Sequence, residues 1–450
     1  MTAPIAIVLA AGRSTRMRSR TPKILHPCAG RALLLWALDA CAAVGARPVV
    51  VLGPSQDDAR ALLPDAGRAV VQDPPRGTGD AVRAALEAVD EADGDAYVLY
   101  GDTPLLRGET LEYLQALRRE RGAAVAILTG TVGTDNAYGR VVRDASGDVA
   151  RIVEARLATP AERALPESNL GAYAVELAWL RAATRRLRPN ATGEIFFTDI
   201  VDLAIADGRT VAAYRTPDPT EGLGVNTRSD LARAEAAMRA RIRDRHLAAG
   251  VSFLDPGSSS VDADVQIAAD VVIERGCVLE GTTRIGADSR IGPYAILRDA
   301  TVGERCRIEG SVLEGATLED DVRVGPFSHL RPGAHLERGV EIGNFGEVKN
   351  ARLRSGTKMH HFSYVGDADI GERVNLGAGV ITMNYDGVRK HRTTVGNDAF
   401  IGSDTLLRAP VIIGEGAATG AGAVVTKDVA PGMLAVGVPA RAIKKRAPRA

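Results

Sequence analysis

The chain has 450 residues and no net charge, because 56 Lys and Arg balance 56 Asp and Glu. The length predicts more than one domain, and the balance argues against a general electrostatic grip on nucleic acid or an anionic membrane surface. No apolar run approaches the roughly 20 residues of a membrane span, and the four cysteines lack metal-ligand spacing. We therefore expect a cytoplasmic protein with free thiols, no membrane span and no nucleic-acid partner.

Residues 1 to about 225 alternate between short apolar segments and helix-like segments. The expected strands are 5–9, 48–52, 69–71, 96–99 and 125–129. The expected helices between them are 32–44, 80–88 and 109–121. This alternation predicts an α/β domain with a mostly parallel sheet, which binds ligands at the carboxyl ends of its strands.

Residues 227–249 predict a connecting helix. Thr227 and Asp230 fit a capping box at its start. An apolar stripe at helical spacing follows: Leu231, Ala234, Met238 and Ile242. We expect this helix to separate a first domain, residues 1–226, from a second domain, residues 250–450.

Beyond residue 250 aliphatic residues recur at every sixth position. The first run is Val261, Ile267, Ile273, Leu279, Ile285, Ile291 and Leu297. The phase slips near Val302 and Leu313 and then returns. A period of six predicts a β-solenoid in which three short strands make one triangular coil, with coils stacked roughly 4.8 Å apart. The insert TMNYDGVRKHRTT interrupts the repeat, and loops that leave a scaffold often carry function.

The stretch LAAGRSTRMRSRTPK follows the first expected strand and concentrates positive charge. It matches neither the dinucleotide fingerprint nor the P-loop. Ala10, Ala11 and Gly12 are small enough to let the backbone approach a ligand, and Arg16 and Lys23 could neutralise a phosphoryl group. A solvated basic loop explains the same residues about equally well.

Other polar groups follow later strands of this domain. QDPPRGTGDA places Gln72, Gly77 and Thr78 in a loop before a helix, which suits recognition of a base by amide and backbone groups. Asp102 in YVLYGDTPLL and Asn226 in GVNTR offer oxygen ligands of the kind that Mg²⁺ takes alongside substrate phosphates. An ordinary loop, turn or helix cap is the structural alternative for each.

The motifs LAAGxxTRM…PK, GTGDA, YGD, YGRVV, VE, GEIFFTDI and GVN, followed by the hexapeptide solenoid, form a specific combination. Together they resemble the bacterial bifunctional N-acetylglucosamine-1-phosphate uridylyltransferase/glucosamine-1-phosphate N-acetyltransferase family over nearly the whole chain. The resemblance implies an α/β nucleotidyltransferase domain (Rossmann-like, mostly parallel sheet), followed by a left-handed parallel β-helix that packs as a homotrimer. It implies acetyl transfer from acetyl-CoA to glucosamine-1-phosphate, and then Mg²⁺-dependent uridylyl transfer from UTP with release of pyrophosphate.

By this resemblance the first domain binds UTP, N-acetylglucosamine-1-phosphate and Mg²⁺. Arg16 and Lys23 would hold phosphates, while Asp102 and Asn226 would coordinate Mg²⁺. The other contacts to nucleotide and sugar fall to Leu9, Ala10, Ala11, Gly12, Gln72, Gly77, Thr78, Tyr100, Gly101, Gly139, Glu154 and Asn169. The sugar phosphate would attack the α-phosphorus of UTP in line, a reaction in which positioning and charge neutralisation do most of the work.

The segment from LRPGAHLE to TMNYDG carries more polar detail than a scaffold requires. We expect the adjacent His360 and His361 to point to opposite sides of a strand. The resemblance makes His361 the general base that takes a proton from the sugar amine, so that the amine attacks the thioester, with Glu347 orienting the imidazole. It assigns the sugar phosphate to Arg331, Lys349, Tyr364, Asn375, Asn384, Tyr385 and Lys390. It assigns acetyl-CoA to Ala378, Ser403, Ala421 and Arg441, the last within a basic tail, RAIKKRAPRA, that is otherwise a frayed end.

Several positions depart from the usual family pattern. Ser14 stands where glycine is common, and Leu170 stands where threonine is usual. The segment VEARLAT, which contains Arg156, lacks the basic and acidic residues expected after Glu154. These changes bear more on the sugar contacts than on the nucleotide contacts.

Two other functions compete with the bifunctional enzyme. One is a single-activity sugar-phosphate nucleotidyltransferase with a structural or regulatory β-helix, and the other is a non-catalytic interaction protein built on the same folds. His361 and its polar neighbours argue against the first alternative. Asp102 together with Lys23 argues against the second.

Overall fold

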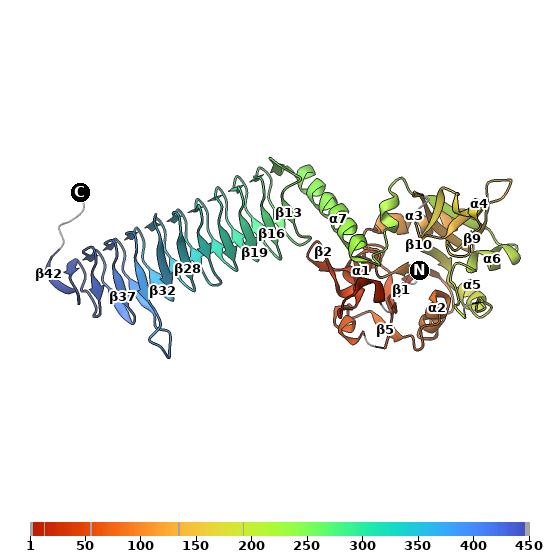
Figure 1. Ribbon diagram of the computed structural model, residues 1–450, viewed down its shortest axis with the longest axis horizontal. Coiled ribbons are helices and arrows are strands. Elements are labelled where there is room, and N and C mark those ends of the chain that lie inside the picture. Colours follow the sequence, from red (N-terminus) through yellow and green to blue (C-terminus); the bar gives the residue numbers. More distant parts are fainter. Residues whose placement is uncertain (1–2, 13, 55, 134–135, 192, 446–450) are drawn as a thin grey trace. The chain divides into compact units, whose positions relative to one another are not determined.

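The computed structural model describes residues 3–12, 14–54, 56–133, 136–191 and 193–445. The chain divides into two compact units, Met1–Met238 and Arg239–Ala450 (Figure 1). Their boundary falls within helix α7 (Arg228–Ala248). Within the described ranges, no helix combines the length and the apolarity that a membrane span requires.

A mixed sheet forms the centre of the first unit, with the strand order β11–β7–β10–β6–β1–β4–β5. Its strands are β1 (Ile5–Leu9), β4 (Arg47–Leu52), β5 (Arg68–Val71), β6 (Asp95–Tyr100), β7 (Val125–Thr131), β10 (Glu167–Glu176) and β11 (Val211–Arg215). The five strands expected from sequence are all present, and β1, β4, β5 and β6 pair in parallel as predicted. Strand β10 was not predicted; it runs antiparallel between β6 and β7.

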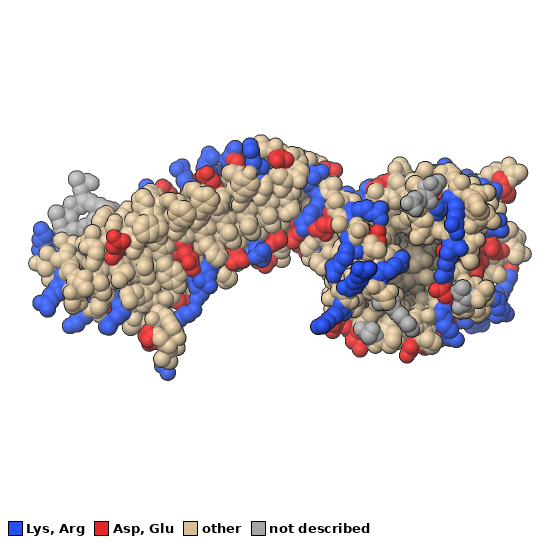
Figure 2. Space-filling view, viewed as in Figure 1, with Lys and Arg blue, Asp and Glu red and all other residues tan. Residues whose placement is uncertain are grey.

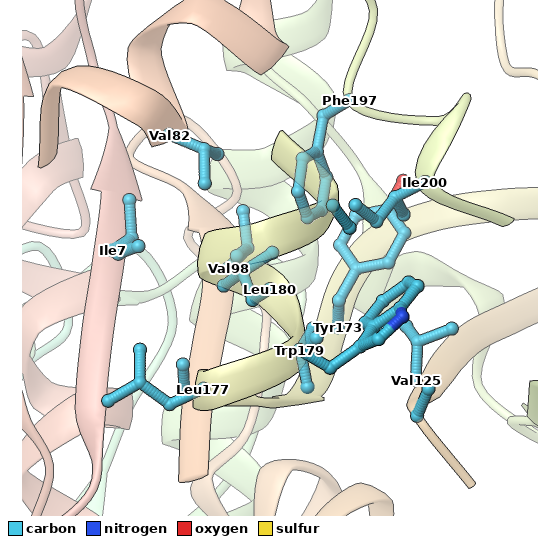
Figure 3. Packing of buried hydrophobic residues seen from close by; sticks show 14 of the residues in the cluster. Ile7, Val82, Val98, Val125, Tyr173, Leu177, Trp179, Leu180, Phe197 and Ile200 are labelled. Atoms are coloured by element: carbon cyan, nitrogen blue, oxygen red, sulfur yellow. The ribbon is translucent and has the colours of Figure 1, made fainter. Parts of the chain in front are cut away.

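Helices cover both faces of this sheet, because successive residues of a strand point to opposite sides. Ile7 and Val98 pack in one cluster, whose helical members come from α2, α5 and α6 (Figure 3). Val8 and Leu99 pack in the other, with side chains of α1 and α3. The helices of the unit are α1 (Leu33–Ala43), α2 (Thr78–Glu87), α3 (Gly108–Glu120), α4 (Pro160–Arg163), α5 (Leu177–Thr184) and α6 (Ile200–Ala206). The three expected helices, α1, α2 and α3, are confirmed.

Two hairpins complete the first unit. Strands β2 (Pro27–Cys28) and β3 (Arg31–Ala32) form one, and β8 (Arg140–Arg143) and β9 (Val149–Val153) form the other, which pairs with β10 through β8. The β8–β9 hairpin brings the segment after β9 to the carboxyl edge of the sheet, where a pocket lies.

The connecting helix α7 begins as predicted. The backbone N–H of Asp230 donates to Thr227 Oγ1 at 3.1 Å, and the backbone N–H of Thr227 donates back to the Asp230 carboxylate at 2.8 Å. Ala234, Met238 and Ile242 of the predicted stripe are buried. The sequence therefore predicted this helix and its cap.

The second unit is a parallel β-helix whose strands form three sheets, here called the first, second and third faces. Ile267 pairs with Ile285 and Ile273 with Ile291, so one coil takes 18 residues, or three hexapeptides. Ile285 pairs with Val302, which shortens that coil by one residue and explains the slip in phase.

Each face takes one strand from every coil. The first face holds β12 (Ser252–Phe253), β15 (Val272–Ile273), β18 (Arg290–Ile291), β21 (Arg307–Ile308), β24 (Arg323–Val324), β27 (Glu341–Ile342), β30 (Lys358–Met359), β33 (Asn375–Leu376), β36 (Phe400–Ile401), β39 (Ala418–Thr419), β41 (Met433–Val436) and β42 (Arg441–Lys445). The second face holds β13 (Ser260–Val261), β16 (Val278–Glu280), β19 (Ile296–Arg298), β22 (Val312–Glu314), β25 (His329–Leu330), β28 (Gly346–Lys349), β31 (Ser363–Gly366), β34 (Ile381–Met383), β37 (Leu406–Arg408) and β40 (Val424–Val425). The third face holds β14 (Gln266–Ile267), β17 (Arg284–Ile285), β20 (Thr301–Val302), β23 (Thr317–Leu318), β26 (His335–Leu336), β29 (Arg352–Leu353), β32 (Ala368–Ile370), β35 (Thr393–Val395) and β38 (Val411–Ile413).

The predicted insert leaves the coil between β34 and β35. Ile381 pairs with Leu406, a separation of 25 residues in place of 18, so the insert adds residues without breaking the ladder. Within it Tyr385 and Lys390 form an antiparallel bridge. The loop thus projects Lys390 from the scaffold while the strands on either side keep their register.

Candidate active sites

A cavity of about 660 Å³ opens at the carboxyl ends of β1 and β6 in the first unit. Figure 2 shows this unit hollowed on the face in view, with Lys and Arg side chains on both sides of the hollow. Of the residues that the resemblance assigned to this site, all but Arg16 and Gly101 line the cavity. The lining residues among them are Leu9, Ala10, Ala11, Gly12, Lys23, Gln72, Gly77, Thr78, Tyr100, Asp102, Gly139, Glu154, Asn169 and Asn226. Gly101 lies beside it and donates its backbone N–H to Leu9 O at 2.9 Å.

The loop after β1 is held by a buried side chain that sequence reasoning missed. Gln56 is 5% exposed; its Oε1 accepts from the Gly53 backbone N–H at 2.7 Å, and its Nε2 donates to Gly12 O at 3.2 Å. This bridge fixes the backbone that the cavity needs close to a ligand. No motif indicated it, because the pairing joins two loops that are far apart in the sequence.

Lys23, Asp102 and Asn226 meet at one point of the cavity. The Lys23 ammonium forms an ion pair with Asp102 and donates to Asn226 Oδ1 at 3.0 Å, and Arg16 Nη2 donates to the same oxygen at 2.9 Å. The Val225 backbone N–H donates to Asp102 O at 2.9 Å, which brings Asn226 alongside Asp102. The two side-chain oxygens thus face one cationic group, and a carboxylate and an amide oxygen are ligands of the kind that Mg²⁺ takes. The described residues hold no cluster of three or more His, Cys, Asp or Glu able to bind a metal.

The family departure at Ser14 has a structural explanation. Ser14 adopts φ +56°, in the left-handed region that favours glycine. Its hydroxyl donates to Gly12 O at 3.3 Å and accepts from the Lys23 backbone N–H at 3.0 Å. The side chain thereby ties Lys23 to the loop after β1. Of the other arginines in this stretch, Arg13 lies outside the described residues.

The loop before α2 forms another wall of the cavity. Gln72 Nε2 donates to Gly77 O at 3.0 Å and to Asp80 Oδ2 at 2.9 Å, which leaves its amide oxygen free of any described partner. Gly77 has φ +118°, and a Cβ there would lie 2.4 Å from Ile195 O, so this position requires glycine. A free amide oxygen beside a tight backbone loop suits a base that donates an N–H.

The opposite end of the cavity holds the sugar-side residues. Glu154 follows β9, and its Oε1 accepts from Thr198 Oγ1 at 2.8 Å. Asn169, in β10, donates from Nδ2 to Tyr173 Oη at 2.6 Å, where the pairing of β10 with β7 is irregular. Burial raises the pKa of Tyr173 well above its usual value, so the phenol stays neutral.

The two sugar-side departures are built into this wall. Leu170 lines the cavity but is only 2% exposed, and it packs so closely that a Cβ on Gly222 would lie 2.6 Å from its own Cβ. Arg156 forms an ion pair with Glu194, another lining residue, and its guanidinium lies 4.7 Å from the centre of the Phe196 ring. Leu170 therefore makes part of this wall apolar, while Arg156 fixes a carboxylate at its edge.

In the second unit, polar side chains gather on the second face and beyond its strand ends. Glu347 and Tyr364 are paired neighbours on β28 and β31. Arg331 Nη1 donates to Glu347 Oε1 at 2.8 Å, and Asn384 Nδ2 lies 3.2 Å from Tyr364 Oη. His361 makes no hydrogen bond with a described residue, so its orientation by Glu347 stays a prediction.

Cations crowd the same edge. Contact with the Lys390 side chain lowers the pKa of Lys349, and the charge of Arg331 acts in the same direction. Asp367 accepts hydrogen bonds from Asn350 and Asn384, at 2.6 and 2.5 Å, which lower its pKa and keep it anionic. Converging cations that oppose one another are arranged to receive an anion such as a phosphate.

Contrary to our expectation, the two adjacent histidines do not lie on a strand. His360 and His361 occupy the turn between β30 and β31, and both are exposed. His360 pairs with Glu341, 2.8 Å from its Nε2. The prediction that both histidines lie on a strand was wrong because the short strand β30 ends at Met359 and the corner begins there.

This corner places His361 at the head of a column. Met359, Leu376 and Ile401 pair in succession on the first face, and Phe400 pairs with Ala418 in the next coil. Two residues beyond the ends of these four strands lie His361, Ala378, Ser403 and Ala421. Four residues assigned to one reaction therefore occupy equivalent positions in four successive coils.

Some assigned residues lie elsewhere. Asn375 is on the first face, next to Lys358 and Phe400 in the ladder, and so on a different side of the triangle from Tyr364. Tyr385 is exposed in the insert, and Arg441 is exposed on β42. The single chain does not bring Asn375 together with the residues of the second face.

Comparison with known proteins finds a matching protein family for a part of each unit. Residues 6–173 match the MobA-like NTP transferase domain, and residues 392–427 match the bacterial transferase hexapeptide (six repeats). The chain is 43% identical to the bifunctional protein GlmU of Trichlorobacter lovleyi over 96% of its own length and 95% of that protein. It is 46% identical to that of Rubrobacter xylanophilus over 98% and 94%, and 45% identical to that of Alkalilimnicola ehrlichii over 96% and 93%. Similarity of this extent shows that the chain belongs to the bifunctional GlmU family.

Proposed function

We propose that residues 1–226 carry uridylyl transfer, that residues 227–249 link the two domains, and that residues 250–450 carry acetyl transfer. A member of the GlmU family is a bifunctional transferase that makes UDP-N-acetylglucosamine, with an α/β nucleotidyltransferase domain followed by a left-handed parallel β-helix. The assignment of each activity to a cavity or face of this chain is the proposal.

In the first unit the cavity end near Gln72 and Gly77 takes the uracil and ribose of UTP, and Arg16 and Lys23 hold its phosphates. Asp102 and Asn226 would hold Mg²⁺, which supplies charge neutralisation on the triphosphate when bound. Glu154, Asn169 and the backbone at Gly139 orient N-acetylglucosamine-1-phosphate. A phosphate oxygen of the sugar attacks the α-phosphorus, and pyrophosphate leaves.

In the second unit Arg331, Lys349 and Lys390 hold the phosphate of glucosamine-1-phosphate, with Tyr364, Asn384 and Tyr385 around the sugar. His361 accepts the proton as the amine attacks the thioester carbon, and CoA leaves as the thiolate, which takes that proton back from the imidazolium to give the thiol. The column of Ala378, Ser403 and Ala421 supports a CoA arm that runs along successive coils from His361. Arg441 meets the phosphate end of CoA.

The acetyl-transfer site is completed by a second copy of the chain in a homotrimer. The separation of Asn375 from the second face supports this, because within one chain Asn375 and Tyr364 lie on different sides of the triangle. A cytoplasmic location follows from the same substrates, UTP and acetyl-CoA. UDP-N-acetylglucosamine is a precursor of cell-wall polymers.

The observation that carries the proposal is the convergence of Lys23, Asp102 and Asn226 within a cavity lined by the assigned nucleotide and sugar residues. The test mixes the full chain with acetyl-CoA and glucosamine-1-phosphate and follows free thiol; UTP and Mg²⁺ are then added and pyrophosphate is followed. We expect both products. Thiol without pyrophosphate would remove the function of the first unit, and pyrophosphate without thiol would reduce the β-helix to a scaffold.

A further inference from the structure

The segment Ile195–Thr198 joins the two ends of the cavity in the first unit. At one end it is tied to the loop before α2: the Ile195 backbone N–H donates to Arg76 O at 2.8 Å, and the Gly79 backbone N–H donates to Ile195 O at 2.9 Å. The Phe197 backbone N–H donates to Thr78 Oγ1 at 2.9 Å. Three hydrogen bonds therefore tie the segment to the loop proposed to hold the nucleotide.

At its other end the same segment holds a sugar-side carboxylate. Thr198 is 4% exposed, lines the cavity, and donates from Oγ1 to Glu154 Oε1. Among the described residues, Glu154 Oε2 accepts no hydrogen bond. One carboxylate oxygen is thus fixed by the protein, and the other is left for a ligand.

This hydrogen bond works against a repulsion. Burial raises the pKa of Asp199, the residue after Thr198, and the charges of Asp202 and Glu154 raise it further; the Asp199 carboxylate makes no hydrogen bond with a described residue. Without the Thr198 hydroxyl, the Glu154 carboxylate would be free to rotate away from Asp199 and out of its place at the sugar end. A net hydrogen bond to a charged group is worth enough to decide between such rotamers.

We propose that Thr198 is a positioning residue for uridylyl transfer, which sets the Glu154 carboxylate for the amino sugar through the hydrogen bond from its hydroxyl. This rests on the proposed function of the cavity. Thr198 does not touch the reacting atoms, so it acts on sugar binding through Glu154 and leaves nucleotide binding alone.

The test compares Thr198→Val, which keeps the shape and removes the hydroxyl, with Thr198→Ser, which keeps the hydroxyl. Thr184→Val is the matched control, since Thr184 is 1% exposed and its hydroxyl donates to Leu180 O at 2.9 Å within α5. In Thr198→Val we expect the KM for N-acetylglucosamine-1-phosphate to rise about ten-fold, with a similar loss of affinity for UDP-N-acetylglucosamine by calorimetry. UTP affinity and acetyl transfer should stay at wild-type values, and Thr198→Ser should restore the KM.

A double-mutant cycle with Glu154→Gln separates positioning from general damage. If Thr198 acts through Glu154, Thr198→Val adds no further loss of UDP-N-acetylglucosamine affinity in the Glu154→Gln background. Additive losses, an equal loss of UTP affinity, a Thr198→Ser enzyme as poor as Thr198→Val, or an unchanged KM would each overturn the inference. If Thr198→Val does not fold, Thr198→Ala takes its place in the same cycle. A wild-type chain without pyrophosphate release would overturn the proposed function, and this inference with it.

Discussion

The two units build their sites in opposite ways. In the first unit, loops after several strands converge on one cavity, where buried Gln56 anchors the backbone of the loop after β1 and buried Thr198 anchors the Glu154 side chain. In the second unit, the repeat sets residues in columns and on flat faces, and His361 and Tyr385 are exposed. A sheet with crossing connections encloses a ligand within one chain, whereas a triangular solenoid offers surfaces that need something opposite them. The comparison teaches that regular repetition places residues accurately but does not by itself make a pocket.

The largest expected effect separates the two sites. Replacing His361 with Ala should lower acetyl transfer by about 10²–10⁴-fold, the usual contribution of a general base, and leave pyrophosphate release unchanged. The measurement is free thiol from acetyl-CoA against pyrophosphate from UTP in the same preparation. His360→Ala is the control and should keep most of the activity, because His360 pairs with Glu341. Loss of both activities in His361→Ala would contradict independent sites.

Asp102→Ala should do the reverse. Removing the Asp102 carboxylate takes away a proposed ligand of the Mg²⁺ that neutralises the triphosphate and also the ion pair that orients Lys23, and we expect pyrophosphate release to fall about 10²–10³-fold. Acetyl transfer should be unaffected. Mn²⁺ binding to the chain, followed by electron paramagnetic resonance, should weaken in parallel. Normal Mn²⁺ binding would show that the metal is held elsewhere.

A mixed assembly tests whether the β-helix needs a second copy. Arg331→Ala and Asn375→Ala chains should each have little acetyl-transfer activity when expressed alone. If one site takes these two residues from different chains, co-expression in equal amounts should restore about a quarter of the sites in a closed ring. Co-expression of Arg331→Ala with Lys349→Ala is the control and should restore none, since both residues lie at the same edge. Equal activity in the two mixtures would place the whole site on a single chain.

The smallest effect concerns pH and stability in the first unit. Burial, with the nearby charges of Asp202 and Glu154, raises the pKa of Asp199 to about 6. The raised pKa means that the charged form opposes folding above that pH, so Asp199→Asn should raise the Tm at pH 8. The gain should fade as the pH drops through 6 towards 4. Solvent screens a partly exposed carboxylate, so only part of the shift reaches stability, and we expect a few degrees at about 2–4 °C per kcal/mol in a unit of this size. Calorimetry across this range is the measurement.

Asp207 supplies the opposite sign as a control for that experiment. Hydrogen bonds from Trp179 and Arg186 lower the pKa of Asp207, so its charged form supports folding. Asp207→Asn should therefore lower the Tm at pH 8, and the loss should shrink as the pH falls below the ordinary aspartate range. The same response in both variants would mean that general charge, and not local contacts, sets the pH dependence.

Sequence predicted the second unit more completely than the first. The period of six predicted the coil, its register and the slip in phase at Val302, because every hexapeptide places an aliphatic residue at the same position of a short strand. It did not predict that His361 lies at a corner, since a two-residue strand leaves no alternation to read. In the first unit the alternating strands and α7 were predicted, but β10 was not. Nine of its ten residues are buried, on both sides of the sheet, so they show no period of two.

The site shows the same limit. Motifs indicated Asp102, Lys23 and Gln72 because each follows a strand or opens a helix. Thr198 and Gln56 had no such signal, since their roles depend on loops that meet only in the folded chain. Side chains that hold other side chains in place are the part of a site that a single sequence conceals.

The residues of the column from His361 to Ala421 are separated by the regular distance between successive coils of the β-helix. An elongated molecule bound along the column must match the distance from its anchoring coil to His361. A thioester with a longer or shorter arm would therefore place its carbonyl carbon away from the imidazole. Deleting or duplicating a complete coil that precedes His361 in the sequence would leave the spacing of these four residues unchanged. The ladder keeps its register although Met359 and Leu376 are 17 residues apart and Leu376 and Ile401 are 25 apart, so the spacing along the column is set by the paired strands and not by the length of the turns between them.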